Sequence, residues 1–397
     1  MGSIRHVVAA AGLFAAFGVP GPGLRAQAVD ADAWRASFAA GEQARQAGDA
    51  AAYAAAMAEA ARAMPAGHLN RPFVQYHAAR GAALTGRNDD ALRWLRTAWE
   101  EEIESLMISF APYDPAFAPL VGTEGFAAVM GLADGMELVV TRLGGRVHLL
   151  AGAGSNVVAQ VGPDGVLLVD TGYRPALPAV RRALAGLATQ GPPDVELLVV
   201  THPHEDHMGS AAELGEEATV FGHPGATAAM GEPYVFMEGV SLPAKQPSAL
   251  PDVEVSTDTS FVFNGEPVRI VATPAHTGGD VSVYFEESRV AHLGDTYLAG
   301  NPMMFPGSED PAGFLEHLDA FLDSMDPATV VVGGHEEPAD LAAVRAQIAA
   351  SRACMAFAEG AVRDGLTLEE AAEQGRERFP VAWIAFFYGY YASKAEG

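Results

Sequence analysis

The hydrophobic pattern divides the chain into three parts. Residues 29–130 are rich in alanine, and their apolar positions recur with helical spacing. At Met136 the pattern changes to short apolar runs that are rich in β-branched residues and are separated by glycine. Helical spacing returns at residue 351. We therefore expect a helical segment over 29–130, a β-rich domain over 136–350 and a C-terminal helical extension over 351–397.

The β-rich part contains runs of strand length, and helical patterns lie between the later ones. Its predicted strands are Leu138–Leu143, Arg146–Leu150, Val157–Val161, Val166–Val169, Glu196–Val200, Ala218–Phe221, Phe261–Phe263, Val268–Ala272, Val281–Phe285, Val290–Leu293 and Thr329–Val332. Its predicted helices are Pro178–Ala188, Gly209–Leu214, Pro311–Met325 and Leu341–Ala350. Strands that first come alone and then alternate with helices predict an α/β fold in which helices cover the sheets.

Two stretches of the N-terminal part resemble each other. In both, small residues precede a glycine turn, at Gly48 and at Gly86, and the two glycines are 38 residues apart. The pattern is similar to a degenerate pair of tetratricopeptide repeats, whose stacked helices often present a concave surface to a partner. Two alternatives stay open from the sequence: the segment binds a protein partner, or it only caps the domain that follows.

Composition restricts the partners and the chemistry. The formal net charge is −26, which argues against a nucleic-acid partner because phosphate binding needs a basic face. The single cysteine, Cys354, excludes an intrachain disulfide and a thiolate metal cluster. Any metal site must therefore use His, Asp and Glu side chains.

The first 28 residues have the features of a secretory signal peptide. Arg5 gives the positive start, Val7–Val19 form the apolar stretch, and Ala26–Ala28 fit a cleavage site. No later run reaches 18 consecutive apolar residues, so we expect no membrane span. The sequence therefore predicts a periplasmic or secreted protein.

A dense polar cluster follows the predicted strand Glu196–Val200. The segment Thr201–Gly209 reads Thr-His-Pro-His-Glu-Asp-His-Met-Gly, and its imidazoles and carboxylates suit a divalent cation of the zinc type. Adjacent side chains point in different directions, so this one segment can serve two metals. Three later segments also place polar residues just after strands, where α/β sites gather, and they contain His276, Asp295 and His335.

Taken together, these segments are similar to the motifs of the metallo-β-lactamase superfamily, in the family's order, over about Met136–Ala350. The family's opening motif, a strand that ends in aspartate, is matched at Leu167–Gly172. The resemblance implies an αββα sandwich of two mixed β-sheets. It also implies a first metal bound by His202, His204 and His276, a second bound by Asp206, His207 and His335, a bridging Asp295, and Asp170 behind the ligands as an orienting group.

The same resemblance implies a zinc-dependent hydrolase with two ions, although iron and manganese share such ligands. Hydroxide generated at the metals would attack an ester, lactone or amide-type carbonyl of a small molecule, with a β-lactam among the options. Asp206 would accept or shuttle a proton. The alternatives are a sulfate or phosphate ester hydrolase, and a helical-repeat binding protein in which the metal centre is auxiliary.

Several branches of the family fit less well. Flavodiiron oxygen reductases carry glutamate at the position of His204, and one class of β-lactamases carries a cysteine near the position of Asp295. The cysteine-free β-lactamases lack the bridging aspartate. Hydroxyacylglutathione hydrolases share all seven ligands but are usually cytosolic, and the predicted signal peptide disfavours them.

Two long segments beside the motifs are expected to shape the substrate pocket. Met230–Pro251 and Tyr297–Pro306 both contain methionine and aromatic residues, which make an adaptable apolar wall. The alternative is that these side chains pack beneath the loops. His292, inside a predicted strand, is expected to pack or donate a hydrogen bond rather than to bind metal.

Overall fold

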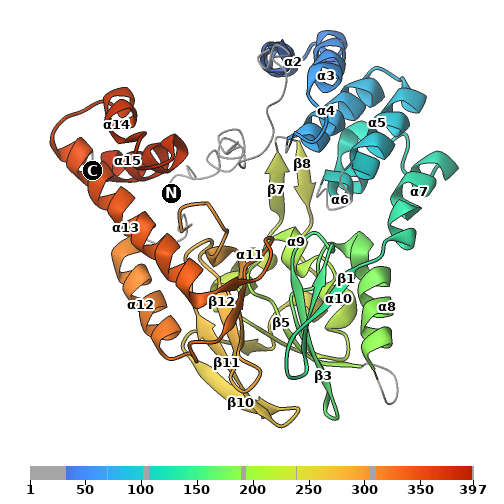
Figure 1. Ribbon diagram of the computed structural model, residues 1–397. Helices are drawn as coiled ribbons and strands as arrows, with labels where there is room; N and C mark the ends of the chain where they lie inside the picture. Colours follow the sequence, from blue (N-terminus) through green and yellow to red (C-terminus); the bar gives the residue numbers. More distant parts are fainter. Residues whose placement is uncertain are drawn as a thin grey trace, which may run out of the picture.

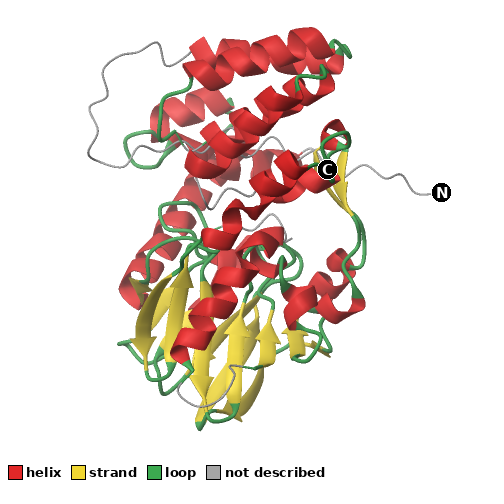
Figure 2. Cartoon of the chain, turned by 90° about the vertical axis from the view of Figure 1, so that its right-hand side faces the viewer, coloured by secondary structure: helices red, strands yellow, loops and turns green. Residues whose placement is uncertain are grey.

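The computed structural model describes residues 33–68, 70–101, 107–188, 194–237, 239–303 and 310–395. Two β-sheets pack face to face with helices on both outer sides, and the N-terminal helices form a separate group above them (Figure 1, Figure 2). The predicted αββα sandwich is therefore confirmed. The predicted signal peptide, residues 1–28, lies outside the described residues and stays a prediction. None of the described helices is both long enough and apolar enough to cross a membrane.

The first sheet has seven strands in the order β1-β2-β3-β4-β5-β6-β9. Its first four strands pair antiparallel and its last four pair parallel, so the sheet is mixed. The central strands are apolar on both faces because both faces are covered. The strand bounds are β1 Val139–Gly144, β2 Val147–Ala151, β3 Val157–Gly162, β4 Gly165–Val169, β5 Val195–Val199, β6 Thr219–Gly222 and β9 Val253–Glu254.

The second sheet has six strands in the order β10-β11-β12-β13-β14-β15. All neighbours pair antiparallel except β13 and β14, which are parallel. Its strands are β10 Thr259–Phe263, β11 Glu266–Ala272, β12 Val281–Phe285, β13 Val290–His292, β14 Val330–Val332 and β15 Ala339–Asp340. Between the sheets, Val158 and Val169 share one buried cluster with Ile270 and Val283, and this cluster forms the core of the sandwich.

Helices cover the outer face of each sheet. The first sheet is covered by α8 (Leu177–Leu187), α10 (Ala211–Leu214) and α11 (Pro224–Met230). The second is covered by α12 (Pro311–Asp323) and α13 (Leu341–Arg363), and α14 (Leu368–Gly375) and α15 (Val381–Ala395) pack against α13 (Figure 1). Trp383 and Phe387 of α15 belong to the same buried cluster as Phe314 and Val331, so the aromatic C-terminal run packs onto the main domain. Because α13 is continuous across residue 350, the predicted domain boundary falls inside a helix.

The N-terminal helices are arranged in antiparallel pairs. Gly48 and Gly86 lie in the left-handed region, with φ of 72° and 74°, and each ends the turn between two helices. The helices are α2 Ala33–Gln46, α3 Ala50–Ala63, α4 Arg71–Leu84, α5 Asn88–Glu101, α6 Met107–Phe110 and α7 Glu124–Met130. The helical segment is therefore present, and its relation to tetratricopeptide repeats stays a prediction.

A two-stranded hairpin joins this helical group to the sandwich. It consists of β7 (Tyr234–Met237) and β8 (Val240–Leu242), within the segment that the sequence analysis took for a long loop. Val240 and Leu242 pack against Phe110 of α6 in one buried cluster. The hairpin extends from the sandwich toward the helices (Figure 1). This contact supports the interpretation of the helical segment as a cap.

Candidate metal centre

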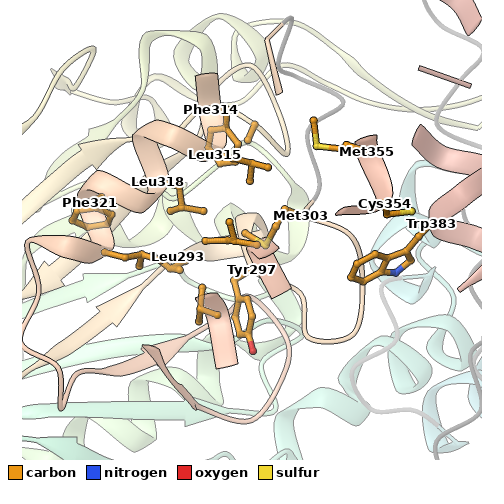
Figure 3. Packing of buried hydrophobic residues seen from close by; sticks show 14 of the residues in the cluster. Leu293, Tyr297, Met303, Phe314, Leu315, Leu318, Phe321, Cys354, Met355 and Trp383 are labelled. Carbon is orange, nitrogen blue, oxygen red and sulfur yellow. The ribbon is translucent and has the colours of Figure 1, made fainter. Parts of the chain in front are cut away.

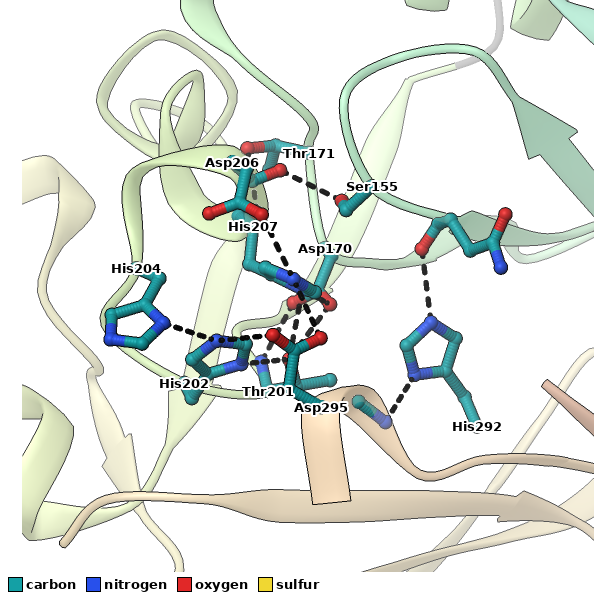
Figure 4. A network of polar contacts seen from close by, with 12 residues as sticks. Ser155, Asp170, Thr171, Thr201, His202, His204, Asp206, His207, His292 and Asp295 are labelled. Carbon is teal, nitrogen blue, oxygen red and sulfur yellow. Dashed lines mark hydrogen bonds and ion pairs between the residues drawn. The ribbon is translucent and has the colours of Figure 1, made fainter. Parts of the chain in front are cut away.

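Five loops bring the predicted site residues to one edge of the sandwich. Asp170 follows β4, the histidine-rich segment follows β5, and His276, Asp295 and His335 follow β11, β13 and β14. β4 is parallel to β5, and β13 is parallel to β14, so their carboxyl ends meet at the same edge. Figure 4 shows the side chains of Asp170, His202, His207 and Asp295 directed toward one another. The structure therefore brings together all seven residues that the sequence singled out as ligands.

The first group consists of three imidazoles. His204 Nδ1 lies 3.1 Å from His202 Nε2 and 3.0 Å from His276 Nε2. Two ligands of a tetrahedral zinc ion, each about 2.0–2.1 Å from the metal, lie about 3.4 Å apart. Asp295 Oδ2 lies 3.8 Å from His202 Nε2 and 3.4 Å from His276 Nε2. The four atoms therefore have the spacing of a cation site.

The second group consists of one carboxylate and two imidazoles. Asp206 Oδ2 lies 3.5 Å from His207 Nε2 and 3.2 Å from His335 Nε2. The other oxygen of Asp295, Oδ1, lies 3.2 Å from His207 Nε2 and 3.4 Å from His335 Nε2. Asp295 thus directs one oxygen to each group, which is the geometry of a bridging ligand.

Two buried atoms of the second group have no hydrogen-bond partner in the described structure. They are His207 Nε2 and Asp295 Oδ1, and they face each other without hydrogen-bond geometry. Leaving a buried polar atom unpaired is costly, about 1–3 kcal/mol. A cation between them would satisfy both atoms, so the donor set fits a divalent metal.

Asp170 fixes the orientation of the His207 ring by a hydrogen bond on the side away from the ligand cluster. Its Oδ2 accepts from His207 Nδ1 at 2.7 Å and from Thr201 Oγ1 at 2.7 Å, and its Oδ1 accepts from the Thr201 amide at 2.8 Å. Because the Nδ1 proton is donated to Asp170, the Nε2 lone pair faces the site. Asp170 has a φ of 62°, a left-handed conformation that is uncommon outside glycine and asparagine. The predicted orienting position of Asp170 therefore agrees with its contacts.

Burial keeps the imidazoles of the first group neutral. It lowers the pKa of His202 well below the ordinary value, lowers the pKa of His204, and lowers the pKa of His276 to about 4. Neutral imidazole is the form that binds a metal. The first group is therefore ready to accept a cation at neutral pH.

Carboxylates dominate the second group. Burial alone would lower the pKa of His207, but the carboxylates of Asp295, Asp206 and Asp170 raise it to about 10. Asp295, with a contribution from Asp206, likewise raises the pKa of His335 against the effect of burial. In return, and again against burial, His207 and His335 lower the pKa values of Asp206 and Asp295. The second group thus has an excess of negative charge that attracts a cation.

Two residues that support the site, Gly334 and Asn156, carry no signal in the sequence that points to this role. Gly334 leaves no space for a side chain, because a Cβ there would lie 1.8 Å from Asp295 Oδ1. Asn156 Nδ2 donates to Gly333 O at 2.9 Å and to Glu336 O at 2.7 Å, which fixes the loop of His335. The ring of His292 contacts Asn156 O at 3.0 Å through Nε2, as expected for a histidine that hydrogen-bonds rather than ligates.

One of the expected pocket segments packs into the core instead. Tyr297 and Met303 are buried in the cluster beneath α12 and α13, beside Leu293 and Trp383 (Figure 3). Met304 and Phe305 lie outside the described residues. In the other segment, Met237 packs toward the N-terminal helices, whereas Tyr234 is 43% exposed. The alternative of packing beneath the loops is therefore the correct one for Tyr297 and Met303.

Residues 150–335 match the family described as the Metallo-beta-lactamase superfamily. Among curated proteins, the chain is 32% identical over 200 residues to Metallo-beta-lactamase domain-containing protein 1 of Mus musculus, covering 47% of this chain and 66% of that protein. It is 31% identical over 145 residues to a hydroxyacylglutathione hydrolase of Acidiphilium cryptum, covering 36% and 51%. A solved metallo-beta-lactamase from Pontibacter korlensis is 21% identical with a TM-score of 0.42, covering 54% of this chain and 98% of that one.

The two curated matches span less than two thirds of the relatives' own length. All seven converging side chains lie within the matched segment, which ends at His335. The sandwich of two mixed sheets and the converging ligand atoms agree with that match. Through residues 150–335, the chain therefore belongs to the metallo-beta-lactamase superfamily.

Proposed function

We propose that this protein is a zinc-dependent hydrolase that cleaves an ester, lactone or amide-type carbonyl of a small molecule. The observation that carries the proposal is the position of Asp295, whose two oxygens face two separate groups of three ligand residues. Its relatives in the family include a hydroxyacylglutathione hydrolase, which supports hydrolysis as the reaction class.

The donor set suits two zinc-type ions. His202, His204 and His276 would hold the first, Asp206, His207 and His335 would hold the second, and Asp295 would be shared. Iron and manganese accept the same ligands, so the identity of the metal depends on its supply. When bound, such ions lower the pKa of water and polarise a carbonyl oxygen.

The residues of the chain orient the metal-binding side chains and transfer a proton during the reaction. Asp170 keeps the Nε2 lone pair of His207 directed into the site, and Gly334 leaves room for the carboxylate of Asp295. The imidazoles of His207 and His335 keep Asp206 ionised, since they lower its pKa. Asp206 can therefore accept a proton from attacking water at its carboxylate and pass it to the leaving group.

Substrate would approach beside His335. The side chain of His335 is 35% exposed, whereas those of His202 and His207 are almost fully buried. A pocket lies next to it, lined by residues of the β2–β3 loop and by the residues that follow His335. A small carbonyl compound that enters this pocket reaches the ligand cluster from its open side.

Metal analysis paired with a substrate panel tests the proposal. Purified protein should contain up to two zinc equivalents and hydrolyse a chromogenic ester, lactone or β-lactam, and chelation should abolish turnover. His202→Ala should lose metal and activity while keeping the circular dichroism spectrum of the native chain. A phosphodiester or sulfate ester as the only substrate cleaved, or full turnover after metal removal, would contradict it.

A further inference from the structure

Cationic residues are nearly absent from the segments that build the site. Between Arg182 and Arg269 the sequence contains one cation, Lys245, and between Arg289 and Arg345 it contains none. These intervals include six of the seven ligand residues, and the seventh, His276, lies between Arg269 and Arg289, where the sequence contains no further cation. Lys245 is already paired with Glu205 in a salt bridge. Before the ligands along the chain, Arg182 donates from Nη2 to Met136 O at 2.6 Å, and Arg174 is paired with Glu213 at 2.6 Å. Among the described residues, the lining of the pocket beside His335 contains no arginine or lysine that could hold an anionic group.

The pocket beside His335 offers acceptors rather than donors. Glu336 and Glu337 lie on its wall, directly after His335. Asn156 directs its amide nitrogen to two backbone carbonyls of that loop, and Ser155 Oγ donates to Asp206 O at 2.7 Å. The side-chain donors of Asn156 and Ser155 are thus engaged within the protein. Glu336 Oε2 is buried, so the exposed carboxylate of Glu337 is the group of the wall that remains to interact with a substrate.

The carboxylates at the ligand cluster limit the positive charge of a metal-loaded site. Asp170, Asp206 and Asp295 lie in or directly behind the cluster and would offset three of the four positive charges that two divalent ions bring. The whole chain carries a net charge of −26. A potential of this sign raises the local concentration of cations and lowers that of anions.

We infer that this site selects its substrate by charge. This inference rests on the proposed function. The site takes carbonyl compounds that carry an ammonium or similar cationic group near the scissile bond. It disfavours compounds that carry a carboxylate, sulfate or phosphate there. The exposed carboxylate of Glu337 on the pocket wall meets the cationic group. The selection comes from Coulomb attraction at the pocket, without a salt bridge inside the ligand cluster.

Three matched esters test the charge preference with the metal-loaded full chain. They are 4-nitrophenyl esters of equal chain length whose acyl groups end in trimethylammonium, tert-butyl or carboxylate. We expect kcat/KM to fall in that order, with at least about a tenfold difference between the first and last at low ionic strength and a smaller one in high salt. Calorimetry with the corresponding ketones, which are not hydrolysed, should give affinities in the same order.

Glu337 offers a variant that does not threaten the fold, because its side chain is exposed. Glu337→Gln should reduce the preference for the cationic ester over the anionic one by several-fold. Glu369→Gln, an exposed change on α14, serves as the matched control and should leave the preference as it is.

The outcomes separate this inference from the proposed function. Hydrolysis of none of the esters would overturn the hydrolase proposal, and the ketone affinities would still decide the charge preference. Equal kcat/KM and equal affinity for all three charges, or a preference for the carboxylate, would overturn the charge preference alone. A preference that Glu337→Gln leaves unchanged would overturn the role of that wall.

Discussion

Two buried histidines in this chain share a hydrogen-bonding pattern but have different neighbouring side chains. His207 in the metal centre and His77 in α4 each use Nδ1, which lies 2.7 Å from Asp170 Oδ2 in one case and 2.6 Å from Tyr53 Oη in the other. In both, Nε2 is buried and has no hydrogen-bond partner among the described residues. The two sites therefore separate the effect of the surroundings from that of the histidine.

The neighbours of the ring give the two histidines opposite properties. The ring of His77 contacts the aromatic rings of Phe38 and Phe73, and burial lowers its pKa to about 3. Carboxylates surround His207 and raise its pKa to about 10 against the effect of burial. A buried ring nitrogen without a partner is therefore no sign of a metal site unless acidic groups face it.

The largest expected effect comes from the glycine beside His207. A Cβ at Gly334 would lie 1.8 Å from Asp295 Oδ1 and 3.1 Å from His207 Cε1. We expect Gly334→Ala to displace the bridging carboxylate, to lower kcat/KM by at least about 100-fold and to lower the metal content. Steady-state kinetics and elemental analysis of the purified variant measure both.

Gly81, one turn after His77, provides the matched change in the helical region. A Cβ there would lie 2.6 Å from Ala54 Cα in the neighbouring helix. Gly81→Ala should lower the free energy of unfolding by about 1–3 kcal/mol and leave the metal content of the folded protein unchanged. Full activity in the Gly334 variant, or metal loss in both variants, would break the contrast between the two regions.

The next largest effect is expected from a change of Asp170, the hydrogen-bond partner of His207 Nδ1. Asp170 accepts three hydrogen bonds, and the amide of an Asp170→Asn variant would present a donor where His207 needs an acceptor. His207 would then change tautomer and lose the Nε2 lone pair, so metal affinity at the second group should fall by about 10–100-fold. Metal titration in buffered zinc checks this, with affinity at the first group as the internal reference.

Asp280 provides the corresponding change on the first group. It accepts from the amides of Ala275 and Thr277 on both sides of His276, at 2.8 Å and 2.7 Å. Asp280→Asn should therefore weaken the first group and spare the second. If either variant weakened both groups equally, the two groups would not be independently supported.

The sequence was sufficient for the ligands because their signal is local. His202, His204, Asp206 and His207 stand within six positions after an apolar strand, and such density has no ordinary packing explanation. By contrast, His77 stands alone on a helix and carries no such signal. The strands of the sandwich were predictable for the same reason, since their period and bounding glycines are local.

The supporting contacts could not be read from the sequence because they join distant segments. Asn156 meets His292, 136 positions away, and Gly334 matters only because Asp295 lies against it. The hairpin of β7 and β8 has no clear strand signal in the sequence, because its short strands pack against Phe110 of a remote helix. Packing between segments, rather than local propensity, decides such features.

A smaller effect is expected from the dependence of stability on pH at His77, which lies apart from the candidate metal centre. Its pKa falls from 6.5 to about 3 on folding because of burial. Between these values the unfolded chain holds one more proton than the folded chain, so the free energy of unfolding decreases as pH falls through this window. The slope from this residue is at most about 1.4 kcal/mol per pH unit.

Denaturant unfolding at several pH values tests that slope. His77→Gln removes the titrating ring, so the difference in stability between the native chain and the variant should shrink steadily from pH 6.5 downward. A constant difference over this range would show that His77 is protonated in the folded state, and its contrast with His207 would disappear.

The smallest effect removes the single hydrogen bond of His77. Tyr53→Phe deletes the hydroxyl that lies 2.6 Å from Nδ1 and leaves the buried ring packing intact. Because a net hydrogen bond is worth about 0.5–1.5 kcal/mol, stability should fall by about that amount, while metal content and kcat/KM stay at the native values. Loss of metal in this variant would mean that the helical region supports the site directly. If stability falls while metal content and kcat/KM stay at the native values, His77 stabilises the helical segment, whereas His207 at the sheet edge serves the candidate metal centre.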